Sequence, residues 1–306
     1  MVDVAGIIAD DWIFPAYVSL CRAAISTAKI IKLLFTAPFN PWQEKLMSNA
    51  KLLIASVYAP SPWNKEWYEL QEKFLQEHTQ DVSYEFGVLL NGIDPDELPH
   101  GANIIGKNPG NTGHSAAMRQ LVDFFRESKG YTHFLFLDSD CFPVKNGWFE
   151  ILCTQMKKFN KNFAAPIRTE NLDRFPHPCA FFSDATGISD ERINFDIGHE
   201  DINILGEVVR DVGNAMMPLL PHILPMLRTN LTNYHPVAAG VYHHLFYHHG
   251  AGSRSFEFRI VDKYGYCDHW WNQAGDVALA DAIRTALFDN PHHFLKTIMS
   301  PPSLKN

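Results

Sequence analysis

The feature that most constrains the fold is a repeated order of buried strands and amphipathic helices in the first half of the chain. Four apolar runs predict strands, at residues 52–58, 82–90, 133–137 and 163–166. Apolar side chains at helical spacing predict helices between them, at 63–78, around Ala117, Leu121, Phe124 and Phe125, and at 148–159. Parallel strands need long crossover connections of this kind. The order therefore predicts an α/β fold with a Rossmann-like, mostly parallel sheet flanked by helices.

Other segments lack this regular order of strands and helices. Gly, Pro and Asn predict a loop over 93–113, and the chain after about Arg168 carries 11 of the 15 histidines with many Pro and Gly residues. This second half is expected to be loop-rich. Within it, apolar residues from Ile202 to Val209 predict a helix opened by Glu200 and Asp201.

Composition narrows the class of protein. The formal net charge is −8 and no clustered basic patch is evident, which argues against a nucleic-acid partner. The five cysteines are an odd number without paired spacing, so they are expected to be reduced rather than part of a disulfide framework or zinc ribbon. They are Cys21, Cys141, Cys153, Cys179 and Cys267.

Residues 1–46 are predicted to form a separate helical segment. Three basic residues and a proline interrupt the apolar stretch 12–39, so no run approaches the roughly 20 apolar residues of a membrane span. The acidic start opposes a signal peptide. A cytoplasmic protein is expected. A helix over 16–35 either packs on the protein itself or lies at a membrane surface, which would make the protein peripheral.

The apolar run Phe134–Leu137 ends in Asp138-Ser139-Asp140. Side chains alternate along a strand, so the two carboxylates point to the same side. In open parallel sheets, ligands bind beyond the carboxyl ends of the strands. Two carboxylates at that edge predict a site for Mn²⁺ or Mg²⁺ that bridges a diphosphate. The alternative is a capping pair that starts the next loop.

A second segment with the same spacing, Asp94-Pro95-Asp96, lies in a turn context after Asn91-Gly92. No apolar strand leads into it to fix the direction of its side chains. Spacing alone therefore carries little information, and the strand before Asp138 carries much.

Several motifs resemble family 2 glycosyltransferases, which have the GT-A fold. They are Asn111-Thr112-Gly113, the run Phe134–Pro143, Gly147–Phe149, Gly198–Asp201 and Val241–Ser253. The resemblance extends from about Lys51 to about Arg254. It implies a GT-A domain at 47–275, with a nucleotide-binding half (47–167) and an acceptor-side half (168–275), followed by a helix and tail at 276–306.

The resemblance implies that Asp201 is the general base. An attacking sugar hydroxyl must lose a proton, and a nearby carboxylate can take it. Glu200 would then orient the acceptor, with His199 also on the acceptor side. The alternative for the two acidic residues is favourable charge in the first turn of a helix. Residues 177–182 fit either an acceptor-side strand or simple core packing.

For the metal, the resemblance adds His248 to Asp138 and Asp140. A zinc site among His243, His244, His248 and His249 is the alternative. Nucleotide-sugar contacts are implied for Tyr58, Pro60, Asn91, Asn111, Gly113, Asp138, Ser139 and Arg254. Lys107 is a further candidate phosphate partner. Leu90 stands where the family commonly carries an Asp, so Asn91 or Asp94 would have to substitute. The base stays open, with a UDP-sugar favoured over a GDP- or dTDP-sugar.

The expected function is metal-dependent transfer of a sugar from a nucleoside-diphosphate sugar to a glycan or other hydroxyl acceptor, with inversion by direct displacement. Three alternatives are a retaining GT-A transferase, a nucleotidyltransferase, and a non-catalytic nucleotide-sugar-binding protein associated with a membrane. A nucleotidyltransferase is less favoured, because no Gly-rich loop with a basic residue follows the first strand.

Overall fold

The structure, a computed structural model, describes residues 49–168, 175–197, 201–202, 208–209, 211–230, 239–250 and 274–300. These residues belong to one compact unit, Met47–Asn306. The predictions for residues 1–46, His199, Glu200 and Arg254 lie outside the described residues. The same holds for Gly198 and Ser253.

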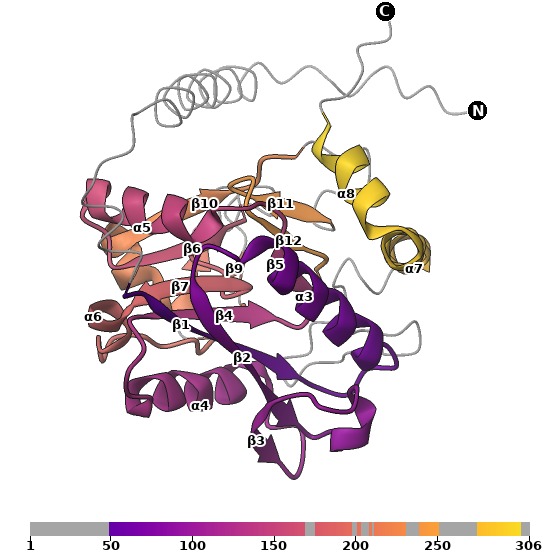
Figure 1. Cartoon of the computed structure of the whole chain (residues 1–306), viewed down its shortest axis with the longest axis horizontal. Coiled ribbons are helices and arrows are strands. Elements are labelled where there is room, and N and C mark those ends of the chain that lie inside the picture. The colour runs from indigo at the N-terminus through magenta and orange to yellow at the C-terminus, as the bar shows by residue number, and fades with distance from the viewer. Residues whose placement is uncertain are drawn as a thin grey trace, which may run out of the picture. The chain divides into compact units, whose positions relative to one another are not determined.

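A seven-stranded sheet forms the centre of this unit (Figure 1), in the order β10-β6-β7-β4-β1-β2-β3. Its strands are β1 (Lys51–Tyr58), β2 (Ser83–Asn91), β3 (Ile104–Asn108), β4 (His133–Asp138), β6 (Phe163–Ile167), β7 (Ala180–Asp184) and β10 (Ile223–Leu227). Every neighbouring pair is parallel except those of β7, which runs antiparallel to both β4 and β6. The predicted α/β fold with a mostly parallel sheet is confirmed.

Helices cover both faces of the sheet because its central strands are apolar on both sides. On one face, Leu52 and Ile54 of β1 pack with α5 (Trp148–Phe159) and the end of α3 (Asn64–His78). On the other face, Leu53 and Ala55 pack with α4 (His114–Glu127) and α6 (Ala185–Ile188). Figure 1 shows α4 on the opposite side of the sheet from α3 and α5.

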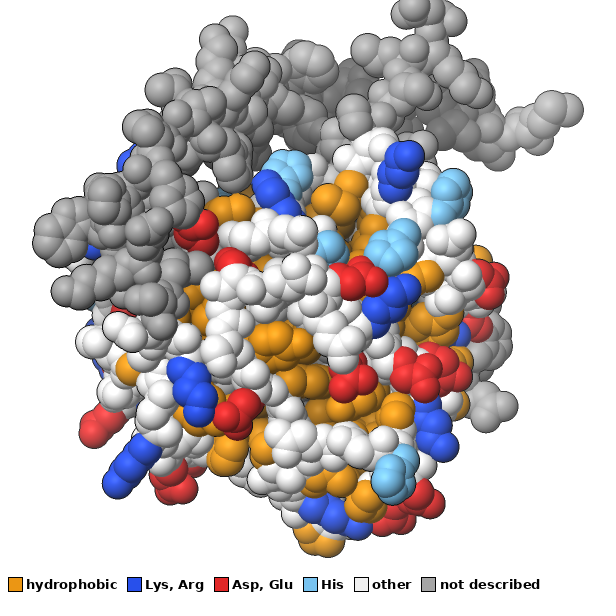
Figure 2. Space-filling model, in the orientation of Figure 1, with side chains coloured by type: hydrophobic (Ala, Val, Ile, Leu, Met, Phe, Trp, Pro, Cys, Tyr) orange, Lys and Arg blue, Asp and Glu red, His pale blue; other side chains and the backbone are white. Residues whose placement is uncertain are grey.

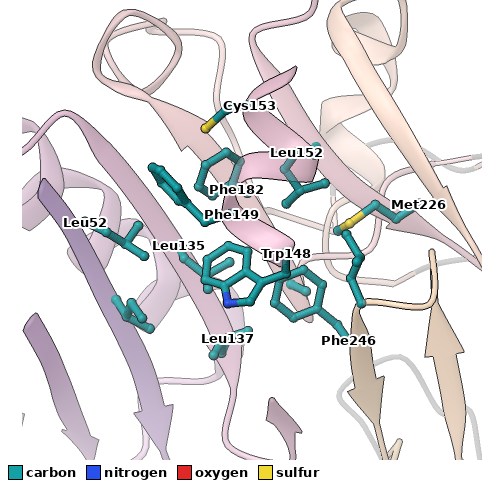
Figure 3. Close-up of a cluster of buried hydrophobic side chains, with 14 of the residues drawn as sticks. Leu52, Leu135, Leu137, Trp148, Phe149, Leu152, Cys153, Phe182, Met226 and Phe246 are labelled. Carbon is teal, nitrogen blue, oxygen red and sulfur yellow. The ribbon is translucent and has the colours of Figure 1, made fainter. Parts of the chain in front are cut away.

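Trp148, the first residue of α5, lies at the centre of the core with side chains of β4 (Figure 3). Its ring is fully buried and meets Phe149, Phe182 and Phe246 edge-on. The indole N–H donates to Thr79 Oγ1 at 3.2 Å, so the one polar atom of the ring is also satisfied. Phe246 belongs to a strand from the second half of the chain, and Trp148 therefore joins the two halves.

That strand is part of a small antiparallel sheet in the order β11-β12-β5. It consists of β5 (Cys141–Pro143), β11 (Gly240–Tyr242) and β12 (Phe246–His248). His248 pairs with Cys141, and Phe246 with Pro143. His248, more than 100 residues after β4 in the sequence, is thus brought beside the residues that follow β4.

The remaining described elements are the 3₁₀ helices η2 (Pro95–Glu97) and η4 (Asn214–His222), strands β8 (Asp201–Ile202) and β9 (Val208–Val209), and helices α7 (Ala274–Asp289) and α8 (Pro291–Met299). Asn290 separates the last two helices, and its side chain accepts a hydrogen bond from His293 N–H at the start of α8. The C-terminal segment therefore holds two helices where one was expected. Arg284 and Phe288 of α7 pack on Trp63 and Trp67.

The structure differs from the predicted elements in two places. The predicted loop 93–113 contains the edge strand β3, whose β-branched Ile104 and Ile105 favour extended backbone. The predicted helix from Ile202 to Val209 is wrong at its two ends, because β8 and β9 pair there as antiparallel strands. Ile202, Val208 and Val209 are β-branched, and Gly206 between them in the sequence disfavours a helix.

Among the helices that the structure describes, none is long and apolar enough to cross a bilayer. On the face that Figure 2 shows, Lys and Arg side chains are interspersed with Asp and Glu. This face therefore offers no continuous basic surface to nucleic acid.

Candidate metal centre

The carboxylate pair follows the central strand β4. Asp138 is the last residue of β4, and Asp140 lies directly before β5. Asp138 N–H donates to Cys179 O at 3.0 Å, and Asp140 O accepts from His249 N–H at 3.1 Å. The backbone that carries both carboxylates is therefore held by the chain on either side of it.

A buried glutamine also holds the backbone of the segment that carries the two carboxylates. Gln71 of α3 donates from Nε2 to Asp138 O at 3.0 Å and to Cys141 O at 2.7 Å. Its Oε1 accepts from the hydroxyl of Tyr58 at 3.0 Å. Tyr58 and Gln71 are both fully buried. Tyr58, predicted to contact the nucleotide, thus supports the turn through Gln71.

His248 completes the group. Its Nε2 lies 3.5 Å from Asp138 Oδ2 and 3.4 Å from Asp140 Oδ1. The side chains of His248 and Asp140 are each 6 % exposed and that of Asp138 is 14 % exposed. Asp138, Asp140 and His248 together could hold a metal ion, because one ligand atom from each lies within 4.8 Å of the others.

The charges in this group support one another. Burial alone would raise the pKa of both carboxyls, but His114 and His248 hold the pKa of Asp138 well below its usual value. His248 likewise lowers the pKa of Asp140. Burial would lower the pKa of His248, yet Cys179 and the two carboxylates raise it well above its usual value. These contacts favour ionised carboxylates, as a cation site requires, and also a protonated His248, whose proton a bound metal would displace.

The donor set fits a hard divalent cation. Asp138 Oδ1 is buried and forms an ion pair with His114, whose Nε2 lies 3.0 Å from it. Carboxylate oxygens and one imidazole suit Mn²⁺, and the oxygens suit Mg²⁺.

His114 brings a helix N-terminus to the site. It is the first residue of α4, and Gly113 before it has φ 86°, a conformation that favours glycine. The contact between His114 and Asp138 places this end of α4 beside the carboxylates. Free backbone N–H groups at a helix N-terminus attract anions. The start of α4, which attracts anions, thus lies beside the carboxylates, which attract cations. A site for a metal and a phosphate group needs both.

A network of asparagines holds the loop before α4. Asn91 Oδ1 accepts from Thr112 N–H at 3.0 Å, from Thr112 Oγ1 at 2.9 Å and from Asn108 Nδ2 at 3.1 Å. Its Nδ2 donates to Asn111 Oδ1 at 3.0 Å. Asn91 is fully buried. The structure thus places Asn91 beneath the loop, with Asn111 and Gly113 exposed above it.

The other predicted nucleotide contacts are more scattered. Ser139 is partly buried within the carboxylate segment, and Pro60 is exposed after β1. Asp94 and Lys107 form an exposed ion pair with each other at 2.8 Å. Asp94 also begins η2, as expected for a turn.

Of the four late histidines, His248 is grouped with both carboxylates as a possible metal ligand. His243 Nε2 lies 2.8 Å from Gln155 Oε1, and His244 occupies the turn between β11 and β12. His249 Nδ1 lies 2.9 Å from the hydroxyl of Tyr247. The alternative zinc site among these four residues is therefore not assembled in the described structure.

The segment before β7 supplies an unexpected set of side chains. His177 and Cys179 are buried beside His248, and the rings of His177 and His248 lie 5.5 Å apart. Burial raises the pKa of the Cys141 thiol, and Cys179 beside it adds to that rise. Burial would also raise the pKa of Cys179, but Cys141, His248 and His177 lower it well below its usual value. Residues 177–182 are thus core residues, and 180–182 belong to β7.

The proposed base lies in a part of the chain described only by its backbone. Asp201 begins β8 and pairs with Val209 of β9. Glu200 and His199, with which it was grouped, lie outside the described residues.

Sequence reasoning missed four residues of this centre: His114, Gln71, His177 and Cys179. His114 could have been found, because it directly follows Asn111-Thr112-Gly113 and opens an amphipathic helix. The other three carry no local signal. They reach the site only through the arrangement of α3 and of the segment before β7.

Comparisons with known proteins leave the family open. No family model matches the chain, and no curated protein matches it. Among solved structures, A197 from STIV matches with a TM-score of 0.37 and 10 % identity, covering 69 % of this chain and all of its own. The galactosyltransferase LgtC, in complex with donor and acceptor sugar analogues, matches with a TM-score of 0.37 and 11 % identity, covering 57 % of this chain and 73 % of its own. Similarity at this level identifies neither a family nor an activity, so the chemistry must come from the site itself.

Proposed function

We propose that this protein is a metal-dependent glycosyltransferase. It would move a sugar from a nucleoside-diphosphate sugar to the hydroxyl of a glycan or other acceptor, with inversion at the anomeric carbon by direct displacement. The observation that carries the proposal is the buried group Asp138, Asp140 and His248 at the carboxyl end of β4. Ligands of open parallel sheets bind at that edge.

Asp138, Asp140 and His248 would hold Mn²⁺ or Mg²⁺. When bound, the metal supplies positive charge that neutralises the departing nucleoside diphosphate, worth several kcal/mol of transition-state stabilisation. Gln71 and the backbone contacts of Cys179 and His249 keep the carboxylates in place. A preorganised site avoids the cost of ordering these groups during the reaction.

The start of α4 is the part of the chain best suited to the diphosphate. His114 and the first N–H groups of α4 lie beside Asp138, and Asn91 holds the loop that leads to them. These groups favour an anion next to the cation site. In this proposal the exposed residues Asn111 and Gly113 would contact the nucleotide sugar, together with Pro60 and Ser139.

Asp201 would accept the proton of the acceptor hydroxyl, with Glu200 and His199 beside the acceptor. A positioned base typically contributes ~10²- to 10⁴-fold in rate. Asp201→Asn should therefore lower turnover by that factor and leave binding of the donor and Mn²⁺ unchanged. Transfer rates can be compared with equilibrium binding of the nucleoside diphosphate. Near-normal transfer by the variant would remove Asp201 from this role.

The proposal is tested most directly by thermal unfolding of the protein with UDP, GDP and dTDP, each with and without Mn²⁺. A ligand present at 100 times its dissociation constant stabilises the folded state by about 2.7 kcal/mol. One nucleotide should raise the unfolding temperature only when Mn²⁺ is present, and this would also identify the base. Absence of any nucleotide effect with Mn²⁺ would contradict the proposal. The anomer of the product, determined by NMR, separates inversion from retention.

A further inference from the structure

His248 has a second set of neighbours besides the carboxylates. One ligand atom from each of His177, Cys179 and His248 lies within 4.8 Å of the others. All three side chains are buried. Imidazole nitrogen and thiolate sulfur are the ligands that zinc prefers, whereas Mg²⁺ and Mn²⁺ prefer oxygen. The two groups that share His248 thus differ in chemical character.

The backbone holds His177 and Cys179 in place. His177 N–H donates to Pro166 O at 2.7 Å, and Cys179 O accepts from Asp138 N–H at 3.0 Å. Both contacts tie the segment to strands of the central sheet or their ends. The two side chains are therefore positioned by the same elements that position the carboxylates.

The His177 ring has a neighbour on each side. Cys179 N–H donates a long hydrogen bond of 3.3 Å to His177 Nδ1, which a metal bound by this nitrogen would replace. On the opposite side of the ring, Nε2 lies 3.9 Å from Asp211 Oδ2. Arg168 Nη2 holds Asp211 at 2.6 Å. A carboxylate behind a histidine is the usual means of fixing the tautomer and direction of a metal ligand.

We propose that His177, Cys179 and His248 form a second metal site, selective for a thiophilic divalent ion such as Zn²⁺, and that the two sites compete for His248. A neutral imidazole has one nitrogen lone pair to give to a metal, so His248 serves one site at a time. Three ligands of this type leave the fourth position of a tetrahedral shell open. Zn²⁺ bound at this second site takes His248 away from Asp138 and Asp140. The resulting loss of Mn²⁺ binding rests on the proposed function.

Co²⁺ is a suitable probe for the site, because a thiolate ligand gives it a charge-transfer absorption in the near ultraviolet. The reduced full-length protein should develop this band on addition of Co²⁺ and lose it on addition of Zn²⁺. Cys179→Ser should abolish the band. Cys153→Ser is the matched control, since Cys153 is also buried and its Sγ lies 3.5 Å from His133 Nε2, but it is not part of the group. A band that survives in Cys179→Ser, or is absent from the native protein, would overturn the proposal.

A second variant guards against misfolding of Cys179→Ser. His177→Gln keeps the thiol and should weaken Zn²⁺ binding by at least the ~10- to 100-fold that follows loss of an outer-shell partner. Affinity is measured by competition with a chromophoric chelator, and circular dichroism reports folding. Unchanged Zn²⁺ affinity in folded His177→Gln would contradict the site.

Competition between the sites is measured by electron paramagnetic resonance of Mn²⁺. Zn²⁺ should release bound Mn²⁺ from the native protein, and much less effectively from Cys179→Ser. Equal release from both would mean that Zn²⁺ simply takes the carboxylate site, as its higher general affinity allows. Asp140→Asn should keep the cobalt–thiolate band and lose Mn²⁺ binding. The two failures are therefore distinct: loss of the band refutes the zinc site, whereas absence of Mn²⁺ binding refutes the proposed function.

Discussion

Two segments of this chain have the same Asp-x-Asp spacing and opposite surroundings. Asp138 and Asp140 follow a buried strand, contact His248 and are nearly excluded from solvent. Asp94 and Asp96 are exposed in and before the short helix η2, where Asp94 pairs with Lys107. The difference teaches that a carboxylate pair becomes a cation site through what holds and surrounds it. Spacing only makes such a site sterically possible.

The largest expected difference between the two segments is in the effects of Asp140→Asn and Asp96→Asn on metal-dependent transfer. Loss of Asp140 should lower metal-dependent transfer by about 10³-fold, because several kcal/mol of charge stabilisation depend on the bound metal and each 1.36 kcal/mol is tenfold. Asp96→Asn should leave both Mn²⁺ binding and transfer unchanged. Rates and Mn²⁺ titrations of the two proteins make the comparison. A similar effect of both substitutions would show that the two segments are equivalent.

The second test removes the core behind the buried segment. Trp148→Ala should destabilise the protein by about 3–5 kcal/mol, because a large ring leaves a cavity that the core fills only partly. Lys107→Ala, which removes the partner of Asp94, should cost less than about 1 kcal/mol, since exposed ion pairs contribute little. Urea unfolding of both variants gives the two values. A small cost for Trp148→Ala would mean that the core is not what fixes the site.

The smallest effect concerns the turn that carries β12 back toward the carboxylates. Burial, with His244 and Lys145, lowers the pKa of His243 to about 4 from 6.5. Between about pH 4 and pH 6.5, His243 is therefore protonated in the unfolded chain and neutral in the folded protein. Stability from the neutral side chain is complete above about pH 6.5 and falls by up to about 1.4 kcal/mol per pH unit as the pH drops toward 4.

This pH effect can be assigned with His243→Asn, because Asn tolerates the positive φ of 56° and does not titrate. Unfolding free energies of the native protein and the variant are measured at pH 7 and pH 5. The native protein should lose more stability over this interval than the variant does. Equal losses would assign the pH dependence to other groups.

Much of the fold could be predicted from local patterns. Clear apolar patterns predict the strands β1, β2, β4 and β6 and the helices α3 and α5. Packing in the folded protein does not override these patterns. β5 is only three residues long, and β3 has only two apolar residues before Gly106, Lys107 and Asn108, so neither strand has a recognisable pattern in the sequence. The run from Ile202 to Val209 was misleading, because an apolar stretch this short fits a helix or paired strands.

The site was predictable only in part. Asp138 and Asp140 could be identified because a buried strand leads directly into the pair, although Asp140 lies in the turn after that strand, and His248 because it ends a late strand. Gln71 and Cys179 act through contacts between segments that the chain does not place near each other in sequence. Such contacts follow from the packing of α3 and β7, which no local pattern encodes.

The pairing of β12 with β5 has a consequence for the order in which the protein is made. Asp138 and Asp140 leave the ribosome long before His248, so the sheet edge exists for a time with two carboxylates and no histidine between them. Domains form as their chain emerges during synthesis. Metal affinity should therefore appear last, when β12 adds to β5. A chain that ends before β12 would have the strand and its carboxylates without His248, and it should bind Mn²⁺ more weakly than the full chain.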